Sequence, residues 1–172
     1  MISRRSIVML IAFLSTTLCL AAPGSTEDAR KAFDRLKRLE GDWHARSSKG
    51  WSETISYEVV ARGSVVVSRT DFADSPESRM YTMFHLDGPR LMLTHYCEAR
   101  NQPRLVATSI EDEGRTITFT FLDATGIRTR DEGHMDKAVY RFGDDDSFSS
   151  RWTWYKDGEE SWMEEIMFER VR

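Results

Sequence analysis

The sequence has very little cysteine: of its 172 residues only Cys19 and Cys97 carry thiols. Cys19 lies in an N-terminal apolar stretch, so removal of a leader would leave Cys97 alone and no intramolecular disulfide could form. Basic residues are also in deficit, with 24 Lys and Arg against 28 Asp and Glu and a formal net charge of −4. That balance excludes the basic surface that nucleic acid selects, so no nucleic-acid partner is expected.

No hydrophobic run is long enough for a comfortable membrane span. The longest one, 7–20, follows Arg4 and Arg5 and precedes small residues, a pattern typical of a secretory signal peptide. We therefore assign residues 1–22 to a signal peptide. The candidate cleavage sites follow Ala21, Ala22 and Gly24. We expect an exported protein located in the periplasm, with no integral membrane span in the mature chain.

Residues 23–172 have the length of one domain built around one core. Only the segment from Ser25 to Leu39 has the helical period, with apolar residues that recur three and four positions apart. Ser25 and Asp28 resemble a capping box with the shorter acid, and Gly41 ends the helix. A single N-terminal helix is therefore predicted.

From Trp43 onward the apolar period changes from about 3.6 to 2 and stays there to the C-terminus. Turn signals divide this region into about nine or ten short strands. The turn signals lie at Gly63, 87–90, 113–114, 143–146 and 157–158. No intervening helix is long enough for a parallel crossover, so an all-β, antiparallel up-and-down barrel is predicted. The longest unpatterned segment, 123–133, is expected to be a mobile flap at the barrel mouth.

The segment Leu39-Glu40-Gly41-Asp42-Trp43 resembles the Gly-x-Trp start of calycin-type barrels, which include lipocalins, fatty-acid-binding proteins and nitrobindin. Together with the strand series and the ending Phe168-Glu169-Arg170, the resemblance covers nearly the whole mature chain. The segments 91–97, 101–104, 121–124 and 133–135 are similar to a bacterial family of exported lipocalin-like proteins that has no established activity. The resemblance implies a calycin-like barrel and export, and it leaves the function open.

The strand from Leu91 to Cys97 places His95 and Cys97 on the same face, because successive side chains of a strand point in opposite directions. If this face points inward, the pair has three interpretations. It could be a nucleophile with its base, or part of a metal site that His85 and His134 would complete. It could also be two interior polar groups without a chemical role. We favour the last interpretation, because no third orienting residue can be identified.

The segment after this strand carries Asn101, Gln102 and Arg104, whose directional donors and acceptors suit the rim of a binding site. Trp152 and Trp154 share one strand face and could form apolar walls. Glu164 falls on an apolar strand face, where a carboxylate needs a partner or a water.

We therefore predict a barrel that binds a small, partly apolar molecule in its interior, with no catalysis and no cofactor assigned. The expected ligand contacts are His95, Cys97, Asn101, Gln102, Arg104, His134, Trp152 and Trp154. Three alternatives remain open: haem binding like that of nitrobindin, for which His134 is the candidate ligand, acid–base catalysis by interior His and Cys, and a structural role in the cell envelope.

Overall fold

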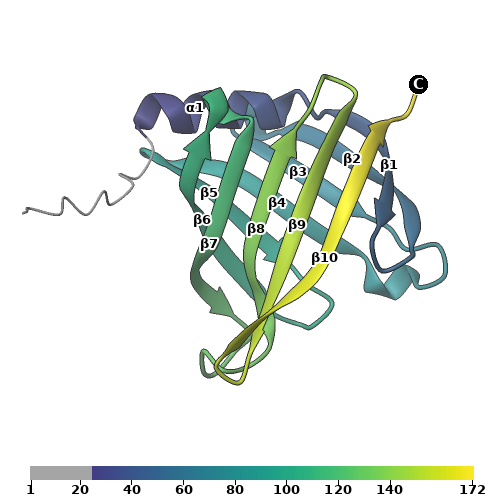
Figure 1. Ribbon diagram of the computed structural model, residues 1–172, viewed down its shortest axis with the longest axis vertical. Helices are drawn as coiled ribbons and strands as arrows, with labels where there is room; N and C mark the ends of the chain where they lie inside the picture. The colour runs from purple at the N-terminus through teal and green to yellow at the C-terminus, as the bar shows by residue number, and fades with distance from the viewer. Residues whose placement is uncertain (1–24) are drawn as a thin grey trace, which may run out of the picture.

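Residues 25–172 form a closed barrel of ten antiparallel strands with one α-helix, and the all-β prediction is confirmed (Figure 1). A computed structural model describes residues 25–172, so the predicted signal peptide lies outside the described residues. Each strand pairs with its neighbours in the sequence, and β1 also pairs with β10, which closes the sheet. The strands are β1 (Gly41–Ser47), β2 (Ser52–Val60), β3 (Val65–Thr70), β4 (Met80–Asp87), β5 (Arg90–Tyr96), β6 (Gln102–Glu111), β7 (Thr116–Thr125), β8 (His134–Phe142), β9 (Ser147–Lys156) and β10 (Glu159–Arg170).

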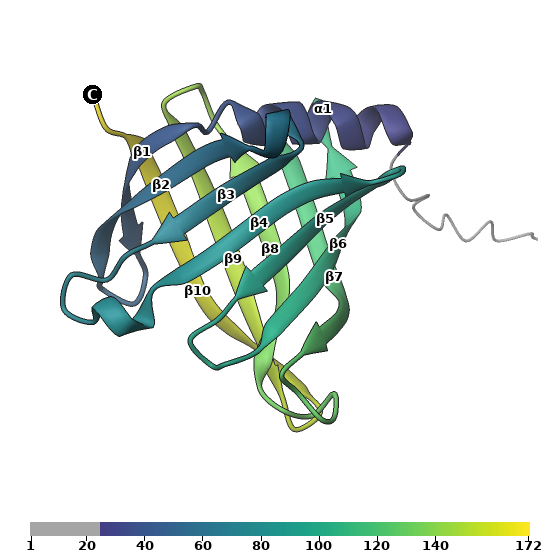
Figure 2. The same ribbon diagram turned by 180° about the vertical axis from the view of Figure 1, so that it is seen from behind.

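The helix α1 (Thr26–Lys37) lies across one end of the barrel, as Figures 1 and 2 show from opposite sides. It begins at Ser25, whose hydroxyl and backbone N–H complete the predicted capping box with Asp28. Its apolar face, including Phe33 and Leu36, is buried against the barrel end. Full burial of such a side chain stabilises the fold by about 1.5–3 kcal/mol. Between residues 25 and 172 no helix is long and apolar enough to cross a membrane.

The turn that carries η3 (Asp112–Gly114) packs directly against this helix. Gly114 has φ +83°, and a Cβ there would lie 3.2 Å from the Cα of Ala32. Only glycine satisfies both the left-handed backbone and the close approach. Gly114 and Ala32 are thus small enough for α1 to pack directly on the barrel rim and cover this end.

The first and last strands meet at a second closure, built by Trp43 and Arg170. The guanidinium of Arg170 lies 4.2 Å from the Trp43 ring centroid and donates to the carbonyls of Arg38 and Glu40, at 2.8 and 3.0 Å. The Trp43 indole donates to the Leu39 carbonyl at 2.7 Å. These contacts join the C-terminal end of α1 to β1 and β10.

The half of the barrel beneath α1 is filled by side chains. Phe84, Phe119 and Tyr140 pack edge to face or tilted, with ring centroids 5.5–6.1 Å apart. Leu93 and Leu105 are fully buried beside them. The predicted ligand space therefore does not extend through the whole interior, and any hollow region must lie toward the other end.

Candidate functional site

A cavity of about 870 Å³ opens at the end of the barrel opposite α1. We call it the mouth cavity. The turn between β1 and β2, the loop between β3 and β4 that includes η2 (Pro76–Ser78), and the turn between β5 and β6 surround it, together with parts of β8, β9 and β10. Its apolar lining consists of Trp51, Phe72, Met80, Met135, Trp154, Trp162 and Met163, with Ala99 at the rim.

A smaller space of about 50 Å³ lies deeper in the barrel and shares lining residues with the mouth cavity, among them Trp51, Met135 and Glu164. We call it the inner space. Its other walls include the polar side chains of Ser68, Thr82, His95 and Ser150 together with the rings of Tyr57, Tyr140 and Trp152. Because a water molecule occupies about 30 Å³ in the liquid, the inner space has room for one or two waters or a small substituent.

His95 is buried at the wall of the inner space, so its face of β5 points inward. Its Nδ1 lies 2.9 Å from the Thr82 hydroxyl, while its Nε2 is buried without a hydrogen-bond partner among residues 25–172. Burial lowers the pKa of His95 to about 4, because a charged imidazole would lose its hydration. The ring is therefore neutral at pH 7 and has one polar atom to offer a ligand or a water.

Cys97 follows the end of β5 and lines the mouth cavity. The two side chains line different parts of the space, His95 the inner space and Cys97 the mouth. Burial raises the pKa of the Cys97 thiol. A protonated thiol is a weak nucleophile, so this environment does not activate Cys97 for covalent chemistry.

Glu164 lies where the mouth cavity and the inner space meet, and its side chain is largely buried. Its Oε2 accepts hydrogen bonds from the Ser47 hydroxyl at 2.5 Å and from the Trp51 indole at 2.9 Å. Its Oε1 accepts none from residues 25–172. The hydrogen-bond partners of this carboxylate within the protein are therefore two neutral donors, not a cation.

Trp152 and Trp154 both point inward, as predicted from their shared strand face. Trp152 is buried, lines the inner space and packs on His95 with ring centroids 5.1 Å apart. Trp154 lines the mouth cavity, and Gly133 packs so closely against its ring that a Cβ would lie 2.4 Å from Cζ2. Gly133 thereby fixes the position of one wall of the mouth.

The three predicted rim residues lie away from the cavity. Asn101 is buried and donates to the Gly133 carbonyl at 2.8 Å, which ties the β5–β6 turn to the loop before β8. Gln102 accepts from Thr125 at 2.6 Å, and Arg104 forms an exposed bidentate pair with Asp123. The roles that the structure assigns to them are cross-strand and loop contacts, and none of them lines the mouth cavity.

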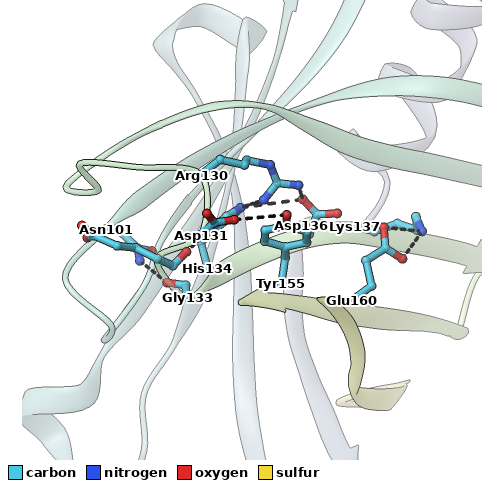
Figure 3. A network of polar contacts seen from close by, with 10 residues as sticks. Asn101, Arg130, Asp131, Gly133, His134, Asp136, Lys137, Tyr155 and Glu160 are labelled. Carbon is cyan, nitrogen blue, oxygen red and sulfur yellow. Dashed lines mark hydrogen bonds and ion pairs between the residues drawn. The ribbon is translucent and has the colours of Figure 1, made fainter. Parts of the chain in front are cut away.

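His134 is completely buried outside the cavity, under the loop 126–133 (Figure 3). Its Nδ1 donates to the Glu132 carbonyl at 2.6 Å, and its Nε2 accepts from Arg130, which also pairs with Asp136. Both ring nitrogens are therefore engaged, and neither is available to ligate haem iron. Burial, as the largest effect, raises the pKa of Asp136 despite the nearby Arg130.

The guanidinium of Arg130 is sandwiched between two aromatic rings, 4.2 Å from the centroid of Phe121 and 3.7 Å from that of Tyr155. The loop 126–133 is thus fastened beside β7 and β9, and none of its residues lines the mouth cavity. The loop lies at the same end of the barrel as the mouth cavity, opposite α1 (Figure 1), and its mobility as a flap stays a prediction.

Several residues that form the mouth were not predicted from the sequence. Trp51, Phe72 and Met80 lie at or just outside strand ends, where period-2 patterning has already stopped, and Met135 precedes a register shift in β8. The available signal was a large apolar residue directly beside a turn, as in Gly50-Trp51. In the part of the chain that the structure describes, no three His, Cys, Asp or Glu side chains are grouped to hold a metal ion.

Comparisons with known proteins support the fold and give no activity. No protein-family model and no curated protein matches the sequence. A solved structure of a protein of unknown function from the DUF3598 family of Nostoc punctiforme PCC 73102 is similar, with a TM-score of 0.50 and 14% identity. The match covers 79% of this chain and 49% of that protein, so the chain spans about half of its length. The architecture is consistent with a calycin-like barrel.

Proposed function

We propose that the chain is an exported, lipocalin-like binding protein that holds a small, partly apolar molecule in the mouth cavity and catalyses no reaction. The observation that carries this proposal is the mouth cavity itself, about 870 Å³ in volume and walled by indole, phenyl and thioether side chains. Small-molecule sites in proteins occupy roughly 300–1,000 Å³ and have mostly apolar walls with a few polar groups. Glu164 and His95 supply such groups at the base of the cavity.

Two features support the lipocalin-like and exported parts of the proposal. The segments that carry the resemblance, 39–43 and 168–170, lie together at the Trp43–Arg170 closure. The N-terminal sequence has the charge and apolar pattern of a signal peptide. Intact-mass measurement of the protein recovered from a bacterial periplasm should show a chain that begins after Ala21, Ala22 or Gly24; recovery of the full-length mass from the cytoplasm would contradict export.

The alternatives find less support in the arrangement of the side chains. An enzyme would need acid–base groups that converge, whereas His95 lies in the interior and His134 outside it. Haem ligation by His134 would require breaking its contacts with Arg130 and Glu132. A structural envelope role would fit a completely filled barrel, and the mouth of this barrel is hollow.

The binding proposal can be tested with the neutral apolar dye N-phenyl-1-naphthylamine, whose fluorescence rises in apolar surroundings. Titration of the mature protein should give saturable binding. Met163→Arg, which places a long cation in the mouth cavity, should weaken dye binding about tenfold or more, since 1.4 kcal/mol corresponds to a factor of ten.

The matched control is Met167→Arg, the same substitution on the same strand at a side chain that is 54% exposed on the outer surface. It should bind the dye as the unaltered protein does. Absence of saturable dye binding, or equal weakening by both substitutions, would overturn the proposed function.

A further inference from the structure

The mouth cavity has a strong excess of negative charge. Four carboxylate side chains line it, those of Glu53, Asp74, Glu98 and Glu164, against one cation, Lys49. None of these five side chains forms an ion pair with another residue between 25 and 172, although that part of the chain contains many exposed pairs such as Arg46–Glu169. A cleft lined by one sign of charge concentrates ligands of the opposite sign.

Glu164 is the member of this group that a bound molecule would meet at the base of the cavity. Its side chain is 9% exposed, and Ser47 and Trp51 fix one of its oxygens while the other stays free. A buried carboxylate is ordinarily matched by a cation or a metal. Since no metal-holding group of side chains occurs among the described residues, an organic cation is the better match.

His95 provides an independent indication that a ligand completes this region. It is 6% exposed and lines the inner space, and its Nε2 is buried without a hydrogen-bond partner from the described chain. Burial keeps this imidazole neutral at pH 7, so His95 cannot act as the counter-ion of Glu164. Lys49, the one cation that lines the cavity, forms no ion pair with Glu164 either, so the cationic group of a bound molecule can take that place.

The remaining lining suits the rest of such a molecule. Indole faces attract cations through the ring quadrupole, and Trp51 and Trp154 both line the cavity. Met80, Met135 and Met163 offer flexible apolar contacts that adapt to a chain or a ring. The cavity thus combines a fixed anion, aromatic walls and apolar space.

We propose that the molecule held in the mouth cavity is a cationic amphiphile, an amine or quaternary ammonium whose charged nitrogen lies against Glu164 and whose apolar part fills the space between Trp51 and Trp154. This inference rests on the proposed binding function and specifies the chemistry of its ligand. It predicts a preference for charge of one sign that a purely apolar cavity would not have.

The test is competition against bound N-phenyl-1-naphthylamine by three probes with the same eight-carbon chain: octyltrimethylammonium, 1-octanol and octyl sulfate, each below its micelle concentration. The ammonium probe should displace the dye at about tenfold lower concentration than octanol does, and octyl sulfate should be the weakest. Equal potency of the ammonium and sulfate probes would overturn the inference while the binding function stands. Failure of the dye itself to bind would overturn the binding function.

Two substitutions in the mouth cavity test whether its charged side chains cause the preference for the ammonium probe. Glu164→Gln keeps the size and the acceptor oxygen and should reduce the ammonium advantage about tenfold while leaving octanol unchanged, whereas Glu58→Gln, on the exposed outer face of β2, should have no effect. Lys49→Gln removes the one cation of the cavity and should strengthen ammonium binding, a result that does not depend on the folding of the Glu164 variant. An undiminished ammonium advantage in Glu164→Gln, or no gain in Lys49→Gln, would contradict the role assigned to these charges.

Discussion

His95, one of two buried histidines, gives the molecule a specific response to acid. In the folded protein His95 has a pKa of about 4, whereas the ordinary value is 6.5. Between pH 6.5 and 4 the unfolded chain therefore binds a proton that the folded chain does not, so the free energy of unfolding falls as the pH falls. Above pH 7 His95 is neutral in both the folded and the unfolded chain, so it adds no pH dependence to the free energy of unfolding.

The loss of stability from His95 should total about 3 kcal/mol across that window, with a slope of at most about 1.4 kcal/mol per pH unit. His95→Gln should be less stable at pH 7, because it loses packing on Trp152, yet its stability should fall less steeply with acid. Urea unfolding of both proteins at pH 7, 6 and 5 measures the difference. Parallel stability curves for the two proteins would contradict the buried, neutral state of His95.

At the scale of elements, the loop 126–133 is held to the barrel by Arg130 rather than by apolar burial. Arg130→Ala would remove the cation from between Phe121 and Tyr155 and would leave the buried Asp136 without its partner. We expect a loss of about 2 kcal/mol in the free energy of unfolding and faster hydrogen exchange at residues 131–133.

The comparison variant for this prediction is Arg128→Ala. Arg128 belongs to the same loop and pairs with Glu132, but its side chain is 92% exposed, so this pair contributes little to stability. Urea unfolding and hydrogen exchange should distinguish the two variants. Equal effects of both substitutions would mean that the loop is held by its backbone and not by the Arg130 sandwich.

At the scale of the whole molecule, the period-2 pattern and its turn signals predicted an antiparallel barrel of about nine or ten strands, and the helical period of Ser25 to Leu39 predicted its one helix. Alternation also put His95 and Cys97 on one strand face and Trp152 and Trp154 on another, although it did not say which of these faces points inward. It could not place Asn101 and Arg104, since a polar residue near a turn can face the rim, the outer surface or another loop.

The set of residues that line the mouth cavity could not be predicted from the sequence, for a related physical reason. Trp51 comes from the β1–β2 turn, whereas Phe72 and Met80 flank the β3–β4 loop, and only the folded barrel brings them together. The sandwich around Arg130 depends on strand neighbours that are 9 and 25 residues away in the chain. Both arrangements are products of tertiary closure, which local patterns do not encode.

The central claim, that the mouth cavity is a binding site, predicts where a ligand perturbs the protein. The most direct measurement is a nuclear magnetic resonance titration of the five tryptophan indole N–H signals with N-phenyl-1-naphthylamine, each signal assigned by a Trp→Phe substitution. The signals of Trp51 and Trp154 in the mouth should shift saturably. The signal of Trp43, buried near α1 with its indole bonded to Leu39, should stay fixed. Shifts at Trp43 without shifts at the mouth tryptophans would contradict the account.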